Sequence, residues 1–464
     1  MPKSDSQPAA ILPLTPVPSA QPTHARYGVL GFVVAMAVIL YLDRMAISVA
    51  LPAIARDLNL DLSELADSVA VFFWCYALFQ IPAGWLGDRW GGRRALALYV
   101  VAWSLAISGM GLVGGLLSLM LMRGLLGIGQ AGAYATSASL LRRWSPQARR
   151  GFATSAVSLG GRAGNVLAPT LTSLLMRLAA TAGMEADRWR PVFLGYGIIG
   201  LIWAVLFWCW FRDEPRLHAG CNQAEIDLIR GDAQIQSDEP IEARDQRAAA
   251  FPLRAMLTHR GLQLLALVNF VVNVGWIFVG TLLPTYLIKI HDFSEVDAGL
   301  AASCTAAAGM AGSLSGGLAT DGLVKRLGLR WGRRVPGLIC CGGAATVYFI
   351  VWNLDDARAI VALLIVASFF GDFALGSMWA TCQDIGGPLA GTVFGTANMF
   401  GNIGAALAAS VIARLAEYFG WSSSFLLSTG AYFSGMLCWL AIDPTVPIAG
   451  THDERQPAVA PDDE

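Results

Sequence analysis

The chain of 464 residues has a formal net charge of −1, and 55% of its residues are hydrophobic while only 14% are charged. Soluble globular domains carry about 25% charged residues, so this composition excludes a soluble protein and predicts one that spans a membrane. The eight cysteines form no CxxC pair and no histidine cluster accompanies them, so we expect no disulfide scaffold, no metal site and no cofactor. No nucleic-acid partner is expected either.

Residues 1–24 are rich in proline and polar side chains and lack the basic start and cleavage site of a signal peptide, which predicts a disordered cytoplasmic tail. A membrane-spanning helix needs about 20 mostly apolar residues. Twelve stretches meet this requirement: 27–51, 66–86, 95–113, 116–141, 151–178, 191–211, 262–288, 296–319, 335–353, 358–383, 391–414 and 422–442. The sequence therefore predicts an all-α integral membrane protein with 12 transmembrane helices in two pseudo-symmetric six-helix bundles.

Residues 213–260 are polar and charged and are expected to form a cytoplasmic linker between bundles at 25–212 and 261–443, with a second disordered cytoplasmic tail at 444–464. With the N-terminus inside, 22 Lys and Arg residues fall on the inner side and 7 on the outer side. Cytoplasmic loops carry the excess of basic residues, so both termini are predicted to be cytoplasmic in a multi-pass protein of the inner membrane. Only three of the 32 basic residues are Lys, which favours a bacterial source.

Two charged segments look like copies of one motif. The first spans 84–94 and the second 317–334, and their aspartates lie 233 positions apart, half the length of the chain. Such a repeat is typical of transporters built from duplicated halves. We expect both copies to form charged latches at the cytoplasmic face that stabilise one access state, through Gly84, Asp88, Arg89, Gly91, Arg93, Arg94, Asp321, Arg333 and Arg334.

These segments resemble the signature of the major facilitator superfamily, and the stretch 123–129 (Arg-Gly-Leu-Leu-Gly-Ile-Gly) resembles its motif in the fourth span. More narrowly, the chain resembles the anion:cation symporter branch, which carries hexuronates, galactonate, sialic acid and other organic anions. That likeness rests on the stretches 41–44, 283–287, 379–384 and 398–402. The branch often has a protonatable Glu seven residues after the span-four Arg, and here Gln130 stands in its place, which leaves proton coupling in doubt.

Ionisable groups in the middle of a membrane cost about 2.5–3.5 kcal/mol each on insertion scales and by default mark a cavity or an ion path. Asp43 and Arg44 lie well inside span one, with Tyr41, Arg44 and Ser48 near one helical face. We expect Asp43 to bind the coupling proton and Arg44 to bind a substrate carboxylate bidentately. The alternative is a buried Asp43–Arg44 ion pair that only closes a gate.

Arg162 lies on span five, and Ser158 shares its face one turn earlier. This arginine is either a second anchor for an anionic substrate or the partner of a carboxylate across the bundle. On span ten, Asp372 and Trp379 lie on one stripe. Asp372 is the candidate acid that replaces the missing glutamate, and the alternative is a hydrogen bond to a neighbouring helix.

Further polar faces occur on spans four, seven and eleven. They supply candidate substrate contacts, and each could equally be ordinary packing between helices. These candidates are Gln130, Tyr134, Asn273, Trp276, Asn398 and Asn402.

The function that the sequence predicts is secondary active transport of a small organic anion, a carboxylate or sugar acid, by alternating access with proton symport. The expected partners are that anion, protons and the lipid bilayer, and the expected functional unit is a monomer. A proton-coupled exporter of drugs or metabolites of the same superfamily is the first alternative, but its usual Gly-Pro pattern in span five is missing around Pro169. A non-transporting nutrient sensor is the second alternative. An enzyme is not expected, because no nucleophile constellation or metal cluster is present in the sequence.

Overall fold

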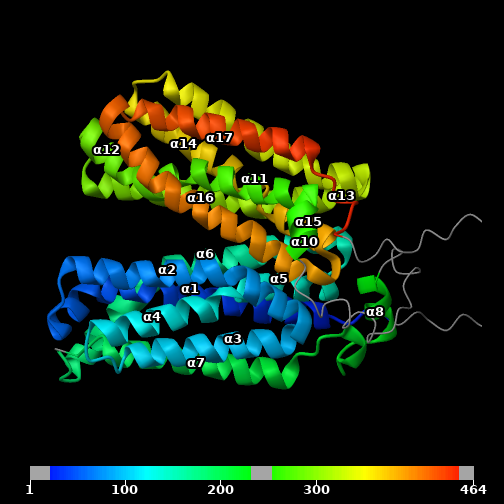
Figure 1. Cartoon of the computed structure of the whole chain (residues 1–464), viewed down its shortest axis with the longest axis horizontal. Coiled ribbons are helices and arrows are strands. Elements are labelled where there is room, and N and C mark those ends of the chain that lie inside the picture. The colour runs from blue at the N-terminus through cyan, green and yellow to red at the C-terminus, as the bar shows by residue number, and fades with distance from the viewer. Residues whose placement is uncertain (1–20, 186, 231–252, 449–464) are drawn as a thin grey trace, which may run out of the picture.

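The computed structural model describes residues 21–185, 187–230 and 253–448. All regular elements in these residues are helices (Figure 1). Most of the two predicted tails and residues 231–252 of the predicted linker lie outside the described part of the chain.

The first bundle in Figure 1 contains the helices that precede the linker. Asp61 and Glu64 begin its second helix with reciprocal side-chain-to-backbone hydrogen bonds, the capping-box arrangement that satisfies two otherwise unpaired N–H groups. Gly91, with a φ of 84°, ends that helix and starts the next, because a residue without Cβ adopts this conformation at little cost. The helices are α1 (Ala25–Leu58), α2 (Leu62–Trp90), α3 (Gly92–Met110), α4 (Leu116–Ala131), α5 (Ala133–Trp144), α6 (Arg150–Thr181) and α7 (Arg190–Trp210).

The second bundle contains the helices after the linker. Its longest helix, α13, runs through two predicted spans and is interrupted by Gly328, whose φ is 75°. A π-helical turn, η4 (Phe278–Leu282), precedes Pro284 in the seventh predicted span. The remaining bounds are α11 (Arg260–Ile277), α12 (Leu283–His291), α13 (Glu295–Trp352), α14 (Ala357–Phe373), α15 (Leu375–Gly386), α16 (Ala390–Phe419) and α17 (Ser422–Ala441).

Eight helices of the described residues are long and apolar enough to cross a membrane. Two of them, Val296–Trp352 and Ala357–Ala408, each cover two predicted spans. Helices α3 and α6 coincide with the predicted spans 95–113 and 151–178. The predicted all-helical membrane architecture is confirmed, and the arrangement is consistent with twelve spans.

The fourth and tenth predicted spans are both broken in the middle. Gly132 separates α4 from α5, and Ala374 separates α14 from α15. A Cβ on Gly132 would lie 2.3 Å from the Tyr99 ring, so this glycine permits close packing of α3 against the break. Each break lies within five residues of candidate site residues.

One end of the bundles, called here the tail end, carries the short helices α8 (Gln223–Arg230) and α10 (Leu253–Thr258) (Figure 1). Gln21 and Ile448 lie at the same end, where they form hydrogen bonds with Asn222 and Ile385. An ion pair between Arg26 and Glu225 holds α8 against the start of α1. The other end of the bundles is called the far end.

Candidate functional site

Arg44 is surrounded by aromatic rings in the first bundle. Its guanidinium carbon lies 4.4 Å from the centre of the Tyr76 ring and 5.1 Å from that of Tyr41, the geometry of cation–π contacts. Its Nε donates to the side-chain oxygen of Gln130 at 3.2 Å, and the Gln130 amide donates in turn to the Leu40 carbonyl at 3.2 Å. One Arg44 terminal nitrogen is buried and makes no hydrogen bond within the described residues. The arginine therefore has an unsatisfied donor inside the first bundle.

Asp43 points away from Arg44 into the first bundle. Its carboxylate is buried, faces the Trp103 indole of α3 and has no hydrogen-bond partner in the part of the chain described. The Asp43–Arg44 ion pair considered as an alternative is not among the ion pairs of the described residues. Two adjacent residues of one helix point about 100° apart, which explains why these two neighbours meet different surroundings.

Arg162 and Asp372 form an ion pair between the two bundles. The Arg162 Nη2 lies 2.6 Å from the Asp372 Oδ2, and the Arg162 side chain stays 25% exposed while that of Asp372 is 9% exposed. A Cβ on Gly309 of α13 would come within 3.0 Å of both side chains, so this glycine leaves room for the pair. The pair across the bundle, one of two alternatives for Arg162, is therefore present, and its partner is the acid that the sequence suggested separately.

An aromatic column from both bundles lies next to these charges. The Tyr134 ring packs edge-on against Tyr41 at 6.5 Å and against Trp379 at 5.3 Å, and Trp379 packs against Phe394 at 4.4 Å. Trp379 and Phe394 belong to the second bundle, so the column crosses the interface. Side chains of this kind can stack on a small ring or close the path towards the tail end.

The three candidate asparagines of the second bundle lie on two neighbouring helices. Asn398 of α16 donates to the Gln80 side chain of α2 at 3.0 Å, a contact between bundles. Asn273 of α11 and Asn402 of α16 each donate to a carbonyl one turn earlier in their own helix. Both are half-buried, so each amide oxygen remains available to a ligand.

Both predicted latches are helix caps between bundles. Asp88, at the end of α2, accepts hydrogen bonds from the backbone N–H groups of Gly391 (2.9 Å) and Thr392 (2.7 Å) in the first turn of α16, and from the Ser139 and Thr392 hydroxyls. Asp321, in α13, accepts from the N–H groups of Gly151 and Phe152 in the first turn of α6, both at 2.9 Å. A carboxylate at a helix N-terminus satisfies free donors and interacts favourably with the helix dipole.

A three-residue charge cluster adds to these caps at the tail end. Asp384 of α15 accepts from Arg150 at 2.6 Å and from Arg333 at 2.9 Å, so it links the second bundle to the start of α6. The Arg333 guanidinium also donates to the Gln147 carbonyl of the first bundle. Each member is almost fully buried, with Arg150 the most exposed at 13%.

Two further latch residues, Arg93 and Arg334, make hydrogen bonds within their own half of the chain. Arg93 donates to the Trp208 carbonyl, its backbone N–H donates to Asp213, and Arg334 donates to the Ile442 carbonyl. The Arg89 guanidinium lies 5.4 Å from the Trp85 ring centre, and Arg94 is exposed. Gly84 touches α16, since a Cβ there would lie 2.5 Å from the Gly391 carbonyl oxygen.

Among the described residues, the central charges form no hydrogen bond or ion pair with the candidates Ser48, Ser158 and Trp276. Ser48 is exposed on α1 one turn beyond Arg44 towards the far end, Ser158 is half-buried on α6, and Trp276 packs over Gly280. Tyr76 contacts Arg44 and Gln80 contacts Asn398, and neither residue was predicted from the sequence. Their spacing with Phe72, at i, i+4 and i+8 of span two, is the signal that could have found them.

Comparison with known proteins agrees with this architecture. The family model of the Major Facilitator Superfamily matches residues 33–409. The chain belongs to the major facilitator superfamily. A protein described as a probable sulfoacetate transporter of Cupriavidus necator is 30% identical over 92% of this chain and 96% of its own. A D-galactonate transporter of Escherichia coli is 28% identical over 92% of this chain and 97% of its own.

Other relatives are named as carriers of sugar acids. A probable galactarate/D-glucarate transporter of Bacillus subtilis is 27% identical over 89% of this chain and 90% of its own. Together with a hexuronate transporter of the same species, these relatives confirm the predicted likeness to the organic anion branch. Among solved structures, the proton:xylose symporter XylE superposes with a TM-score of 0.66 at 15% identity over 90% of this chain and 96% of its own, which shows the shared fold. The protein is therefore a multi-pass membrane transporter.

Proposed function

We propose that this protein moves a small organic anion, a carboxylate or sugar acid, by alternating access with proton symport, and that Arg44 and Arg162 are its anion anchors. The observation that carries the proposal is the ion pair between Arg162 and Asp372 across the two bundles. The names of the relatives, carriers of sulfoacetate, galactonate, galactarate and glucarate, support the class of substrate.

Arg44 is the first anchor because no carboxylate pairs with it in the described residues. It is held in place by Gln130 and by the rings around it, so little side-chain entropy remains to be lost on binding. A planar guanidinium binds a carboxylate in a bidentate manner. Gln130 cannot titrate, and in this role it orients Arg44 and offers hydrogen bonds to hydroxyl groups of the substrate.

Arg162 is the second anchor, and Asp372 competes with the substrate for it. In the structure the two neutralise each other, and the Arg162 side chain is the more exposed of the pair. A substrate anion that binds Arg162 leaves the Asp372 carboxylate without its cation. An unpaired buried carboxylate is costly, so uptake of a proton by Asp372 accompanies anion binding. This exchange couples the two fluxes without the glutamate that Gln130 replaces.

Asp43 is the second proton-binding group of the proposal. It is fully buried with no hydrogen-bond partner in the described residues, so a bound proton would remove the cost of burying an uncompensated charge. The transport cycle then requires Asp43 to reach water in at least one access state. The tail end, which we infer to be cytoplasmic, is closed in this conformation by the two aspartate caps and the Asp384 cluster.

The test is uptake of radiolabelled organic acids, including sulfoacetate, galactonate and glucarate, into proteoliposomes with and without an inward proton gradient. A gradient supplies about 1.4 kcal/mol per pH unit for each proton. Wild type should accumulate one of these acids only with the gradient. Asp372→Asn and Asp43→Asn should each abolish gradient-driven accumulation, and Arg44→Gln should abolish binding of the acid.

Asp67→Asn is the matched control, because Asp67 is an exposed carboxylate of α2 that lies outside the proposed site. It should behave as wild type. Equal uptake with and without the gradient would contradict symport and leave a facilitator or an exchanger. Failure to take up any acid in the panel would contradict the substrate class.

A further inference from the structure

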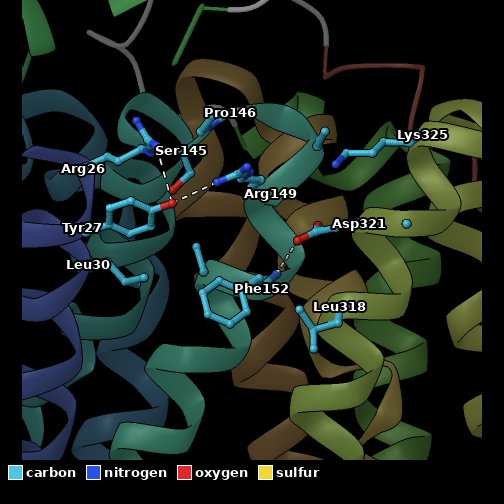
Figure 2. A pocket seen from close by; sticks show the side chains of 13 residues that line it. Arg26, Tyr27, Leu30, Ser145, Pro146, Arg149, Phe152, Leu318, Asp321 and Lys325 are labelled. Atoms are coloured by element: carbon cyan, nitrogen blue, oxygen red, sulfur yellow. Dashed lines mark hydrogen bonds between the residues drawn. The ribbon is translucent and has the colours of Figure 1, made fainter. Parts of the chain in front are cut away.

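A pocket opens at the tail end where the two bundles meet, apart from the central charges. It has a volume of about 380 Å³ and is lined by the start of α1, the segment between α5 and α6, and the part of α13 around residues 318–325. Figure 2 shows Arg149 near the middle of the view, Lys325 to its right and Asp321 below both. Residues from both bundles therefore build it.

The upper rim of the pocket is positively charged. Arg149 and Lys325 are both exposed, and neither forms an ion pair within the part of the chain that the structure describes. The Arg149 guanidinium donates to the Tyr27 hydroxyl at 2.9 Å (Figure 2). Arg26 is already paired with Glu225, and the Asp321 carboxylate already accepts the two α6 N–H groups. Neither cation at the rim is therefore within ion-pair distance of a carboxylate in the described residues, although the Asp321 carboxylate lies one helical turn from Lys325.

The lower wall of the pocket is apolar. Leu30, Phe152 and Leu318 line it beneath the cations, and Leu318 is 54% exposed. Tyr27, 43% exposed, lies at the opening, and tyrosine is typical of the level of lipid headgroups. A soluble anion would use the cations and leave the apolar wall unused. An anion with an attached hydrocarbon chain would use both.

We propose that this pocket binds an anionic phospholipid, with the phosphate held by Arg149 and Lys325 and an acyl chain packed on Leu30, Phe152 and Leu318. Basic side chains at the end of membrane helices attract anionic headgroups. Because Arg149 belongs to the first bundle and Lys325 to the second, one headgroup joins the two bundles at the tail end. The lipid then stabilises the conformation in which this end is closed. This proposal does not depend on the identity of the transported substrate.

The experiment uses the purified full-length protein in a mild detergent, with thermal unfolding followed as lipid is added. Phosphatidylglycerol should raise the Tm with saturation, and phosphatidylcholine should not. Native mass spectrometry should count one tightly held phosphatidylglycerol per chain. In Arg149→Gln and in Lys325→Gln, the half-saturating lipid concentration should rise about fivefold, as expected for one basic residue near a headgroup.

Arg326→Gln is the matched control, because Arg326 is exposed next to Lys325 but does not line the pocket. It should leave the lipid titration unchanged. A loss in Arg326→Gln as large as in Lys325→Gln would overturn the proposal in favour of general surface attraction. Stabilisation by glycerophosphate or inorganic phosphate equal to that by the lipid would overturn it in favour of a soluble-anion site.

Discussion

At the scale of single residues, the site consists of charges that the fold brings together from distant positions. Arg162 and Asp372 are 210 positions apart in the chain and lie 2.6 Å from each other. Gln130 and Arg44 are 86 positions apart and share a hydrogen bond. Each contact involves a residue that is unusual by itself: Arg162 is an arginine in the middle of a span, and Gln130 stands where the branch often has glutamate. The contact with Asp372 or Arg44 suggests what each residue does.

Neutralising one member of the Arg162–Asp372 pair should lower the stability of the folded protein more than neutralising both. Arg162→Gln and Asp372→Asn each leave one charge unpaired. Breaking a fully buried ion pair in this way lowers the free energy of unfolding by ~3–5 kcal/mol. The loss should be smaller here, because the Arg162 side chain is a quarter exposed. The double variant should recover most of the lost Tm in detergent. Additive losses in the double variant would show that the pair contributes no coupling energy.

Gln130→Glu should place a carboxylate beside Arg44 and weaken anion binding. The Gln130 oxygen already accepts from the Arg44 Nε at 3.2 Å, so a glutamate there can form an ion pair with it. We expect the apparent KM for the transported acid to rise about tenfold at pH 8, the effect of about 1.4 kcal/mol of competing interaction. At acidic pH, where this glutamate protonates, the difference should shrink. A pH-independent KM would contradict the competition.

At the scale of elements, the two bundles are joined by the first turns of α16 and α6. Each helix begins against an aspartate from the opposite bundle, Asp88 for α16 and Asp321 for α6, in a pseudo-symmetric arrangement. The helices also approach closely, because Gly84 lies against Gly391 and Gly317 against Gly151. Residues of the repeated motif therefore contact helix ends of the opposite bundle.

Gly84→Ala should prevent full closure of the tail end, since its Cβ would lie 2.5 Å from the backbone oxygen of Gly391. The measurement is the distance distribution between spin labels on Arg94→Cys and Arg326→Cys, exposed positions of the two bundles, in a cysteine-free background. The labels should move apart in Gly84→Ala. Gly322→Ala is the control, because a Cβ there meets nothing within 4 Å. Unchanged distances in Gly84→Ala would refute the docking role.

His218, in the segment after α7, should make stability depend on pH. Burial, and then the nearby Arg212 charge, lower the pKa of this imidazole, which packs against Trp210 and accepts from the Gly220 N–H at Nδ1. The folded state then binds fewer protons than the unfolded state, whose histidine pKa is about 6.5. This stabilisation is complete above that pH and is lost as the pH falls through the lowered pKa.

The Tm of wild type should therefore decrease between pH 7.5 and pH 5, and the decrease should be smaller in His218→Gln. His24→Gln, at an exposed position before α1, is the control and should retain the slope of wild type. An identical slope in His218→Gln and wild type would exclude His218 as its source.

At the scale of the whole molecule, the polar contacts found between the bundles in the described residues gather on one side. Among the described residues, every ion pair or side-chain hydrogen bond that joins the bundles lies between the tail end and the level of Arg162 and Asp372. Beyond that level, Ser48 of α1 and Asn165 of α6 are exposed. The molecule is thus held together at the tail end.

Ser48→Cys should accordingly react with a membrane-impermeant thiol reagent added from the far side. The test uses a cysteine-free background in oriented vesicles, and saturating substrate should slow the reaction because Ser48 lies one turn from Arg44. Ser137→Cys is the control, since Ser137 is fully buried in α5 and should stay unreactive. Equal reactivity of Ser48→Cys from both sides would contradict closure of the tail end.

The sequence by itself determined the all-helical membrane architecture, the family and the class of the transporter. Apolar spans and a repeated charged motif are local patterns, so they can be recognised without knowing how the helices pack. It also singled out Arg44, Arg162 and Asp372, because a charge within an apolar span is conspicuous in one dimension. Only the tertiary structure decided which of these charges meet. In the folded protein, Arg162 pairs with Asp372, and Asp43 points away from Arg44. Asp88 and Asp321 cap helices of the opposite bundle. Pairing across an interface depends on helix rotation, on the backbone approach allowed by Gly84 and on the space that Gly309 leaves for side chains. None of these can be deduced from spacing along one chain.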